Sequence, residues 1–268
     1  LAIIISQSGE TLDTMAALRE AKSLGAHILS IVNVVGSSIA RESDDVLYTW
    51  AGPEIAVATT KAYSTQLVLL NMLGLCFADI LGTVSAAEYT EMVDELLRLP
   101  AKMEQILEHT DDIKHYASNY FNHNSVFFIG RNLDYAMGLE GSLKLKEISY
   151  IHSEAYASGE LKHGTISLIE DGTLVVALGT YAPLFDKAMS NVVEVQARGA
   201  DVLALTTESH AAEMRKTVEN VITVPESHTI FQPSLGVVPL QLFAYYVALL
   251  RGCDIDKPRN LAKSVTVE

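Results

Sequence analysis

The hexapeptide SQSGET at 6–11 has the composition of an anion-binding turn. Its hydroxyl and amide donors come from Ser6, Gln7, Ser8 and Thr11. A buried strand precedes the turn and a helix is expected to follow it, so the free N–H groups of the first helical turn would favour a phosphate group. The turn contains no lysine, which excludes a nucleotide-binding P-loop. The alternative is a polar strand-to-helix turn in which Ser8 or Thr11 caps the helix.

A second set of candidate residues shares one face of an expected helix. Lys144 and Glu147 are three positions apart, and Glu140 and Lys144 are four apart. Abstraction of a proton from a carbon beside a carbonyl needs a carboxylate base and a cation or donor for the developing enolate oxygen. These residue types therefore fit such a proton transfer. The alternative is a solvated ion pair on the helix surface, which contributes little to stability.

Two histidines and one lysine are further candidates. His163 lies in a segment flanked by glycines, and His152 is the other side chain that could supply an imidazole titrating near neutral pH. Lys263 would reach a site if the C-terminal tail folds over it, and a disordered tail is the alternative. The histidines and cysteines show neither HExxH nor CxxC spacing, so we expect no metal and no cofactor.

The composition excludes several classes of protein. Hydrophobic residues make up 49% of the 268 residues, which is enough for a packed core and too much for a disordered chain. The formal net charge is −14 and basic residues do not cluster, which argues against a nucleic-acid or membrane surface. Two cysteines are too few for a disulfide framework, and with the acidic composition they favour a reducing cytoplasm.

Short β-branched runs alternate with longer amphipathic segments, which is typical of parallel sheets covered by helices. The expected strands are 2–6, 27–33, 45–49, 125–130, 173–178, 201–206 and 221–224. The expected helices are 11–24, 55–80, 88–99, 102–109, 112–122, 138–151, 183–198, 210–219 and 237–251. The most apolar stretches, 66–81 and 237–250, are interrupted by polar residues or too short to cross a bilayer, and we expect both to be buried core helices.

An internal repeat indicates two copies of one α/β unit. The strands expected at 2–6, 27–33 and 45–49 are matched by three others about 172 to 175 positions later. The second copy has an additional leading strand and helix whose counterparts would precede residue 1, so we expect the first copy to be truncated and the chain to be a fragment. The predicted domains are 1–82 (partial first unit), 83–111 (helical linker), 112–252 (second unit) and 253–268 (a tail folding over the active site).

Five strings carry a specific resemblance to a known family. They are SQSGETLDT, NVVGSSIARESD, AGPEIAVATTKAY, LEGSLKLKEISYIHSEAYASGELKHG and DKPRNLAKSVTVE. Together they resemble the isomerase half of the glutamine–fructose-6-phosphate aminotransferase family, from within its first sugar-isomerase (SIS) domain to its C-terminus. The fold that this implies is α/β, with two SIS-type units, each a parallel sheet flanked by helices, and an irregular C-terminal tail.

The resemblance also implies an activity. The family transfers the amide nitrogen of glutamine to fructose 6-phosphate and isomerises the sugar to glucosamine 6-phosphate, in amino-sugar biosynthesis leading to UDP-N-acetylglucosamine. Its glutaminase domain, with an N-terminal cysteine nucleophile, is absent from these residues, as is a Gly-Thr-Ser turn that completes the phosphate site. We therefore expect that this chain alone cannot use glutamine and is weak or inactive as an isomerase. Thr165 stands where the family usually has proline after the histidine loop.

Each candidate residue receives a role from the resemblance. Glu147 would move the proton between C1 and C2, and Lys144 would stabilise charge beside it. His163 would assist ring opening from the neighbouring subunit, which implies a homodimer. Lys263 would act on the open-chain sugar as a Schiff-base former or as an electrostatic partner. Phosphate binding would fall to Ser6, Gln7, Ser8 and Thr11, and the sugar site would be lined by Val57, Thr59 and Ala262.

Two other functions fit part of the pattern. One is a stand-alone SIS isomerase or deglycase that acts on another sugar phosphate, although such an enzyme has no reason to end in the family's specific C-terminal peptide. The other is a non-catalytic SIS module that binds a sugar phosphate, which would not need Glu147, His163 and Lys263 together.

Overall fold

The computed structural model describes residues 1–263, which form two compact units. Unit 1 comprises Leu1–Phe77 together with the chain from Asp256 onward, and unit 2 comprises Ala78–Ile255. These units are defined by contacts alone, so the four domain ranges given above remain a prediction. Residues 264–268 of the predicted tail lie outside the described part of the chain.

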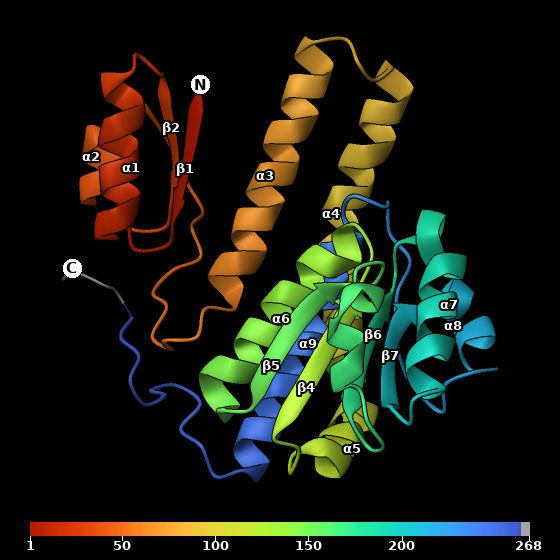
Figure 1. Ribbon diagram of the computed structural model, residues 1–268. Helices are drawn as coiled ribbons and strands as arrows, with labels where there is room; N and C mark the ends of the chain where they lie inside the picture. Colours follow the sequence, from red (N-terminus) through yellow and green to blue (C-terminus); the bar gives the residue numbers. More distant parts are fainter. Residues whose placement is uncertain (264–268) are drawn as a thin grey trace. The chain divides into compact units, whose positions relative to one another are not determined.

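Unit 1 is built on a three-stranded parallel sheet (Figure 1). Its strands, in spatial order, are β1 (Ala2–Ser6), β2 (Ile28–Val32) and β3 (Asp45–Tyr48). Its helices are α1 (Leu12–Ser23), α2 (Ser38–Glu42) and most of α3 (Lys61–Ile80). Leu18 of α1 and Ile39 of α2 are fully buried against Ile28 of β2, so these two helices cover one face of the sheet.

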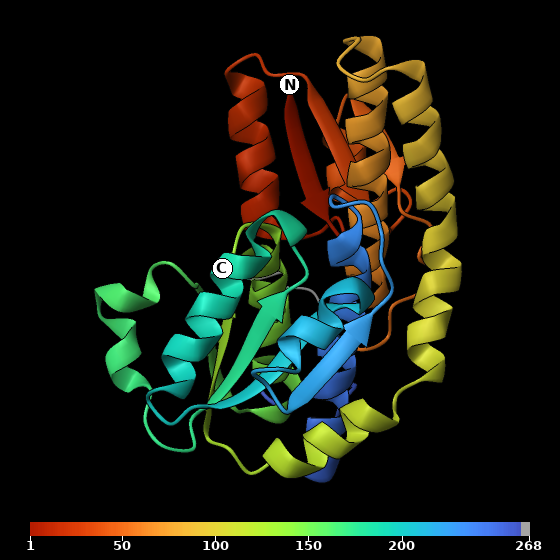
Figure 2. The same ribbon diagram turned by 90° about the vertical axis from the view of Figure 1, so that its right-hand side faces the viewer.

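Unit 2 is built on a five-stranded parallel sheet with helices on both faces (Figure 1, Figure 2). In spatial order its strands are β5 (His152–Ala157), β4 (Ser125–Gly130), β6 (Leu174–Gly179), β7 (Asp201–Thr207) and β8 (Asn220–Val224). Two helices, α7 (Phe185–Gln196) and α8 (Glu208–Met214), pack on one face. The other face is covered by α6 (Leu133–Ser149) and α9 (Gln232–Leu250), which pack with α5 (Asp111–Tyr120) and α4 (Ala86–Glu108).

The predicted fold class is confirmed. Both units are parallel sheets flanked by helices, and 251–263 contain neither helix nor strand. The three strands of unit 1 have the same chain order and direction as β6, β7 and β8 of unit 2, as the internal repeat predicts. In unit 2, β4 and β5 extend the sheet beyond β6, whereas no described strand lies beside the outer edge of β1.

Several predicted elements were wrong. The helices expected at 88–99 and 102–109 are one helix, α4, which continues through Pro100 because Leu99 and Ile106 are buried on either side of it. The helix expected from residue 55 begins at Lys61. Strand β5 and the short helix α2 were not predicted at all.

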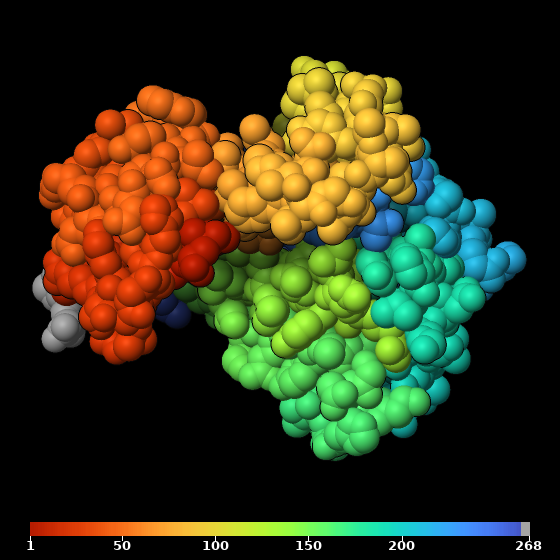
Figure 3. All heavy atoms as spheres, turned by 90° about the horizontal axis from the view of Figure 1, so that it is seen from above, coloured from red at the N-terminus to blue at the C-terminus, as the bar shows by residue number. Residues whose placement is uncertain are grey.

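Within residues 1–263, two helices are long and apolar enough to cross a membrane by length and composition, a test that core helices of water-soluble proteins also pass. In α9, 61% of the most apolar window is buried, so the predicted core helix is confirmed. In α3 the same share is 6%, so the prediction of a second buried core helix is wrong. Ile80 at the end of α3 and Leu81 after it are exposed, and this turn lies at the surface in Figure 3.

Candidate active site

The predicted anion-binding turn joins β1 to α1 at the carboxyl edge of the unit 1 sheet, where open α/β sheets bind ligands. Ser6 Oγ accepts a hydrogen bond from the Gly9 N–H at 3.0 Å and lies 3.4 Å from Thr11 Oγ1. Ser8 Oγ accepts one from the Glu10 N–H at 3.2 Å. Thr11 is the N-cap residue of α1, but its side chain makes no capping hydrogen bond. The first N–H groups of α1 therefore keep their capacity to bind an anion.

Gly9 and Glu10 fix the shape of this turn. Gly9 has a φ of +67°, and a Cβ there would lie 2.1 Å from Ser37 Oγ. The Ile39 N–H donates to the Gly9 carbonyl at 3.0 Å, which ties the turn to α2. The Glu10 carboxylate accepts the Ser38 N–H at 2.8 Å, and this hydrogen bond lowers the pKa of Glu10. The one acidic side chain within the turn is thus paired with the N-terminus of α2.

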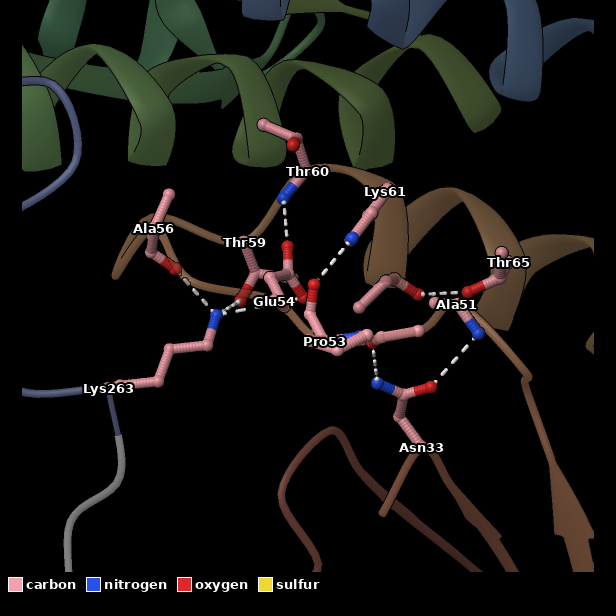
Figure 4. Close-up of polar contacts among 12 residues, drawn as sticks. Asn33, Ala51, Pro53, Glu54, Ala56, Thr59, Thr60, Lys61, Thr65 and Lys263 are labelled. Carbon is pink, nitrogen blue, oxygen red and sulfur yellow. Dashed lines mark hydrogen bonds and ion pairs between the residues drawn. The ribbon is translucent and has the colours of Figure 1, made fainter.

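Lys263 lies in a second polar cluster of unit 1 (Figure 4). Its Nζ donates to the Ala56 carbonyl at 2.7 Å and to Thr59 Oγ1 at 3.2 Å. It also lies 3.6 Å from Glu54 Oε2, and the Glu54 side chain is only 3% exposed. The other oxygen of Glu54 accepts the Thr60 N–H at 3.0 Å. Lys263, predicted to act on the open-chain sugar, and Thr59, predicted to line the sugar site, therefore lie in direct contact.

A second contact holds the tail against the same loop. The Val57 N–H donates to the Asp256 carbonyl at 2.9 Å, and Pro258 is buried. Ala262, which precedes Lys263, is exposed. The structure thus brings Val57, predicted to line the sugar site, to the start of the tail that carries Lys263.

Asn33 connects the two clusters of unit 1. Its backbone N–H donates to the Gln7 carbonyl at 3.1 Å. Its side chain accepts the Ala51 N–H at 2.9 Å and donates to the Gly52 carbonyl at 2.8 Å (Figure 4). A continuous run of polar contacts therefore extends from the anion-binding turn toward the loop that holds Glu54 and Thr59.

The predicted lysine–carboxylate set lies on α6 in unit 2. Lys144 Nζ forms a short ion pair with Glu147 and lies 3.7 Å from Glu140 Oε1. The side chains of Lys144, Glu140 and Glu147 are 5%, 9% and 21% exposed, so this is not a solvated surface pair. Burial raises the pKa of Glu140 to about 7, with the Lys144 charge opposing the shift and the Glu147 charge adding to it. Glu140 therefore changes charge near neutral pH.

The sequence placed Glu140 on the same helix face as Lys144 but gave it no role in the site. The helix that carries these groups is held closely against α9, since a Cβ on Gly141 would lie 2.8 Å from a methyl carbon of Leu240. This packing positions the buried charges on a rigid element.

The two histidine candidates lie elsewhere in unit 2. His163 ends the 3₁₀ turn Leu161–His163, in which Leu161 is buried and the histidine is exposed. No hydrogen bond or ion pair connects it to Lys144 or Glu147 among residues 1–263. His152 begins β5, and its Nε2 lies 3.9 Å from Glu154 Oε1. Neither imidazole joins the charged cluster on α6 within the described contacts.

Other places were considered as binding sites. Within residues 1–263, no group of three His, Cys, Asp or Glu side chains could hold a metal ion. A cavity of about 640 Å³ in unit 2 is lined by residues at the amino ends of three strands, among them Ser125, His152 and Thr173. Open α/β sheets bind ligands at the opposite, carboxyl edge, so this cavity is not assigned to the site.

Comparisons with known proteins match this geometry. The family model of the SIS domain matches 1–75 and 119–251. Glutamine–fructose-6-phosphate aminotransferases (isomerizing) of Clostridium tetani and Clostridium acetobutylicum are 59% and 56% identical to the chain, over 100% of it and 44% of each relative. A solved C-terminal domain of glucosamine-fructose-6-phosphate aminotransferase from Francisella tularensis superposes with a TM-score of 0.91 and 38% identity, covering 96% of this chain and 73% of that one. The chain thus spans less than half the length of these curated relatives.

Proposed function

Because the chain belongs to the SIS domain family, we propose that it is the isomerising part of a glutamine–fructose-6-phosphate aminotransferase. Its substrate is fructose 6-phosphate, and its product is glucosamine 6-phosphate, made with ammonia from a glutaminase domain outside these 268 residues. The observation that carries this proposal is the buried ion pair between Lys144 and Glu147, because proton transfer between adjacent sugar carbons needs a carboxylate and a cation in this arrangement.

In this proposal Glu147 moves the proton. After the ring has opened and ammonia has replaced the oxygen at C2, which leaves as water, the Glu147 carboxylate takes a proton from C1 and delivers it to C2. The imine nitrogen gains one proton and the C1 hydroxyl loses one, so that C2 carries an amine and C1 an aldehyde. The charge that develops on the enediol-like intermediate is stabilised by the Lys144 ammonium. Because Lys144 is buried, its charge acts through little water, which strengthens its effect on the intermediate.

Unit 1 binds the substrate in this proposal. The Ser6–Thr11 turn holds the phosphate through hydroxyl groups and the N–H groups of α1. Without substrate, Lys263 is paired with Glu54 and Thr59. When the open-chain sugar binds, Lys263 acts as its electrostatic partner. A Schiff base on Lys263 would require Nζ to lose a proton and to leave these partners.

We also propose a homodimer in the cytoplasm. His163 is exposed, so an imidazole from one copy can reach the site of another and assist ring opening. The product would supply amino-sugar biosynthesis toward UDP-N-acetylglucosamine. Two acidic groups beside one lysine and an overall charge of −14 support the absence of nucleic-acid partners.

A chimeric enzyme tests the proposal directly. The chain replaces the 268 aligned residues of the Clostridium tetani relative, which supplies the preceding sequence. We expect the chimera to form glucosamine 6-phosphate from glutamine and fructose 6-phosphate. Glu147→Gln in the chimera should lower kcat at least about 1000-fold while fructose 6-phosphate binding changes little, since the carboxylate acts on the proton and not on the phosphate.

The matched control is Glu219→Gln, a change of the same type at an exposed residue outside the cluster. It should leave turnover and binding unchanged. A folded chimera that hydrolyses glutamine but forms no amino sugar would contradict the proposal. Conversion of fructose 6-phosphate to an aldose 6-phosphate without nitrogen transfer would instead favour the stand-alone isomerase.

A further inference from the structure

The carboxyl end of β6 in unit 2 corresponds to the end of β1 in unit 1, but a buried carboxylate occupies it. Residues 178–183 read LGTYAP there, without the serines of the unit 1 turn. The N–H groups of Thr180 and Tyr181 both donate to Asp134 Oδ2 at 3.0 Å. The Thr180 hydroxyl donates to the other oxygen of the same carboxylate. Two backbone N–H groups and one hydroxyl thus converge on one anion.

Asp134 is held without a cation. Its side chain lies in the first turn of α6 and the residue is 2% exposed. No lysine, arginine or histidine forms an ion pair with it among residues 1–263. Burial raises the pKa of Asp134, while the hydrogen bonds from Thr180 and Tyr181 oppose that shift. Within the described contacts the carboxylate is therefore bound by two N–H groups and one O–H group, as a phosphate would be in an uncharged turn.

The Asp134 side chain lies at the carboxyl edge of the unit 2 sheet, where a ligand would bind in an open α/β fold. Strands β4 and β6 are neighbours, and the chain leaves their carboxyl ends in opposite directions, toward β5 on one side and β7 on the other. Open α/β sheets bind ligands in the crevice at this reversal of strand order. A Cβ on Gly130, at the end of β4, would lie 2.5 Å from the backbone carbon of Asp134. The first turn of α6 therefore lies directly on β4 and reaches across to the turn after β6.

We propose that the turn after β6 is an oxyanion site that Asp134 permanently fills, and that this internal carboxylate closes unit 2 to sugar phosphates. The ligand class that the empty site would take is a small oxyanion, such as formate or a phosphate group. A consequence, which rests on the proposed function, is that the Ser6–Thr11 turn is the phosphate site of this chain. The anion that binds the turn would then be the phosphate of the substrate in unit 1 and the Asp134 carboxylate of the chain itself in unit 2.

The test is chemical rescue of Asp134→Gly by anions. The Asp134→Gly variant and its parent both carry Ser6→Ala and Ser8→Ala, so that the turn of unit 1 contributes little to anion binding. We expect Asp134→Gly to lower the melting temperature by about 5 °C or more, since it leaves the buried N–H and hydroxyl groups of Thr180 and the partly buried N–H of Tyr181 without their partner. Formate or inorganic phosphate should restore most of this loss, and chloride at equal ionic strength should not. Phosphorus NMR should detect one bound phosphate in the glycine variant and none in its parent.

Asp134→Asn is the matched control. The asparagine side chain has the same size and fills the site, so its melting temperature should fall but should not respond to formate or phosphate. If Asp134→Gly is unfolded in chloride, refolding in formate is the expected result. Equal effects of chloride and formate, rescue of the asparagine variant, or absence of rescue would each overturn the proposal. These readouts involve no turnover, so a failure here is distinguishable from a failure of the proposed enzyme activity.

Discussion

Glu140 makes the stability of unit 2 depend on pH. Its pKa is raised from 4.5 to about 7, so between these values the folded protein holds a proton that the unfolded chain has lost. The stabilisation is complete below pH 4.5 and is lost as the pH rises toward 7. We predict that Glu140→Gln removes this slope, which amounts to roughly 3 kcal/mol over the whole window. Urea unfolding of the Glu140→Gln variant and of the unsubstituted protein at several pH values measures this slope. If the free energy of unfolding falls with pH equally in the two proteins, Glu140 is not the titrating group.

At the residue scale, local spacing predicted contacts along one helix but not contacts between distant segments. Lys144 and Glu147 are in contact as their spacing on one helix face requires. Glu54, the buried partner of Lys263, was missed because the two residues are separated by the whole of unit 2 in the sequence. No periodicity relates such positions, and only the folded loop reveals their contact.

The β1–α1 turn is an element whose shape depends on one glycine. An alanine at position 9 would have to adopt a φ of +67°, which residues other than glycine rarely do. Its methyl group would also overlap Ser37 Oγ. We predict that Gly9→Ala lowers the affinity for inorganic phosphate at least about tenfold, because the N–H groups of the turn lose their alignment. Phosphate titration by calorimetry checks this.

Ser37→Gly provides the control for that experiment. Alone it should change phosphate affinity little. Combined with Gly9→Ala it removes the overlapping hydroxyl, so the double variant should bind phosphate more tightly than Gly9→Ala alone. Equal affinities of the single and double variants would show that backbone strain, and not the overlap with Ser37, limits binding.

At the element scale, most strands were predictable because each is a short run rich in apolar residues. The central strands of unit 2 are buried, as such runs predict, whereas Ile3 and Ile5 of β1 are exposed, so the buried strand expected before the 6–11 turn was wrong. Strand β5 was missed because half of its sequence, HSEAYA, is polar, none of it is β-branched, and its one described strand partner is β4. The break expected at Pro100 was wrong because burial of Leu99 and Ile106 outweighs the missing N–H of proline. In both places the decisive interaction is tertiary and leaves little pattern in the local sequence.

At the scale of the whole molecule, the charge of −14 opposes the binding of an anion, and the 6–11 turn has no basic side chain to offset it. Local dipoles attract the phosphate only at short range, whereas the acidic surface repels it over about 30 Å at 10 mM salt and about 8 Å at 150 mM. We therefore predict that the affinity for fructose 6-phosphate rises between these salt concentrations, which calorimetric titration measures. Anions bound by surface lysines or arginines show the opposite dependence on salt. An affinity that falls as salt rises would therefore contradict the prediction and indicate that basic side chains bind the phosphate. Lys263→Met would then test Lys263 first.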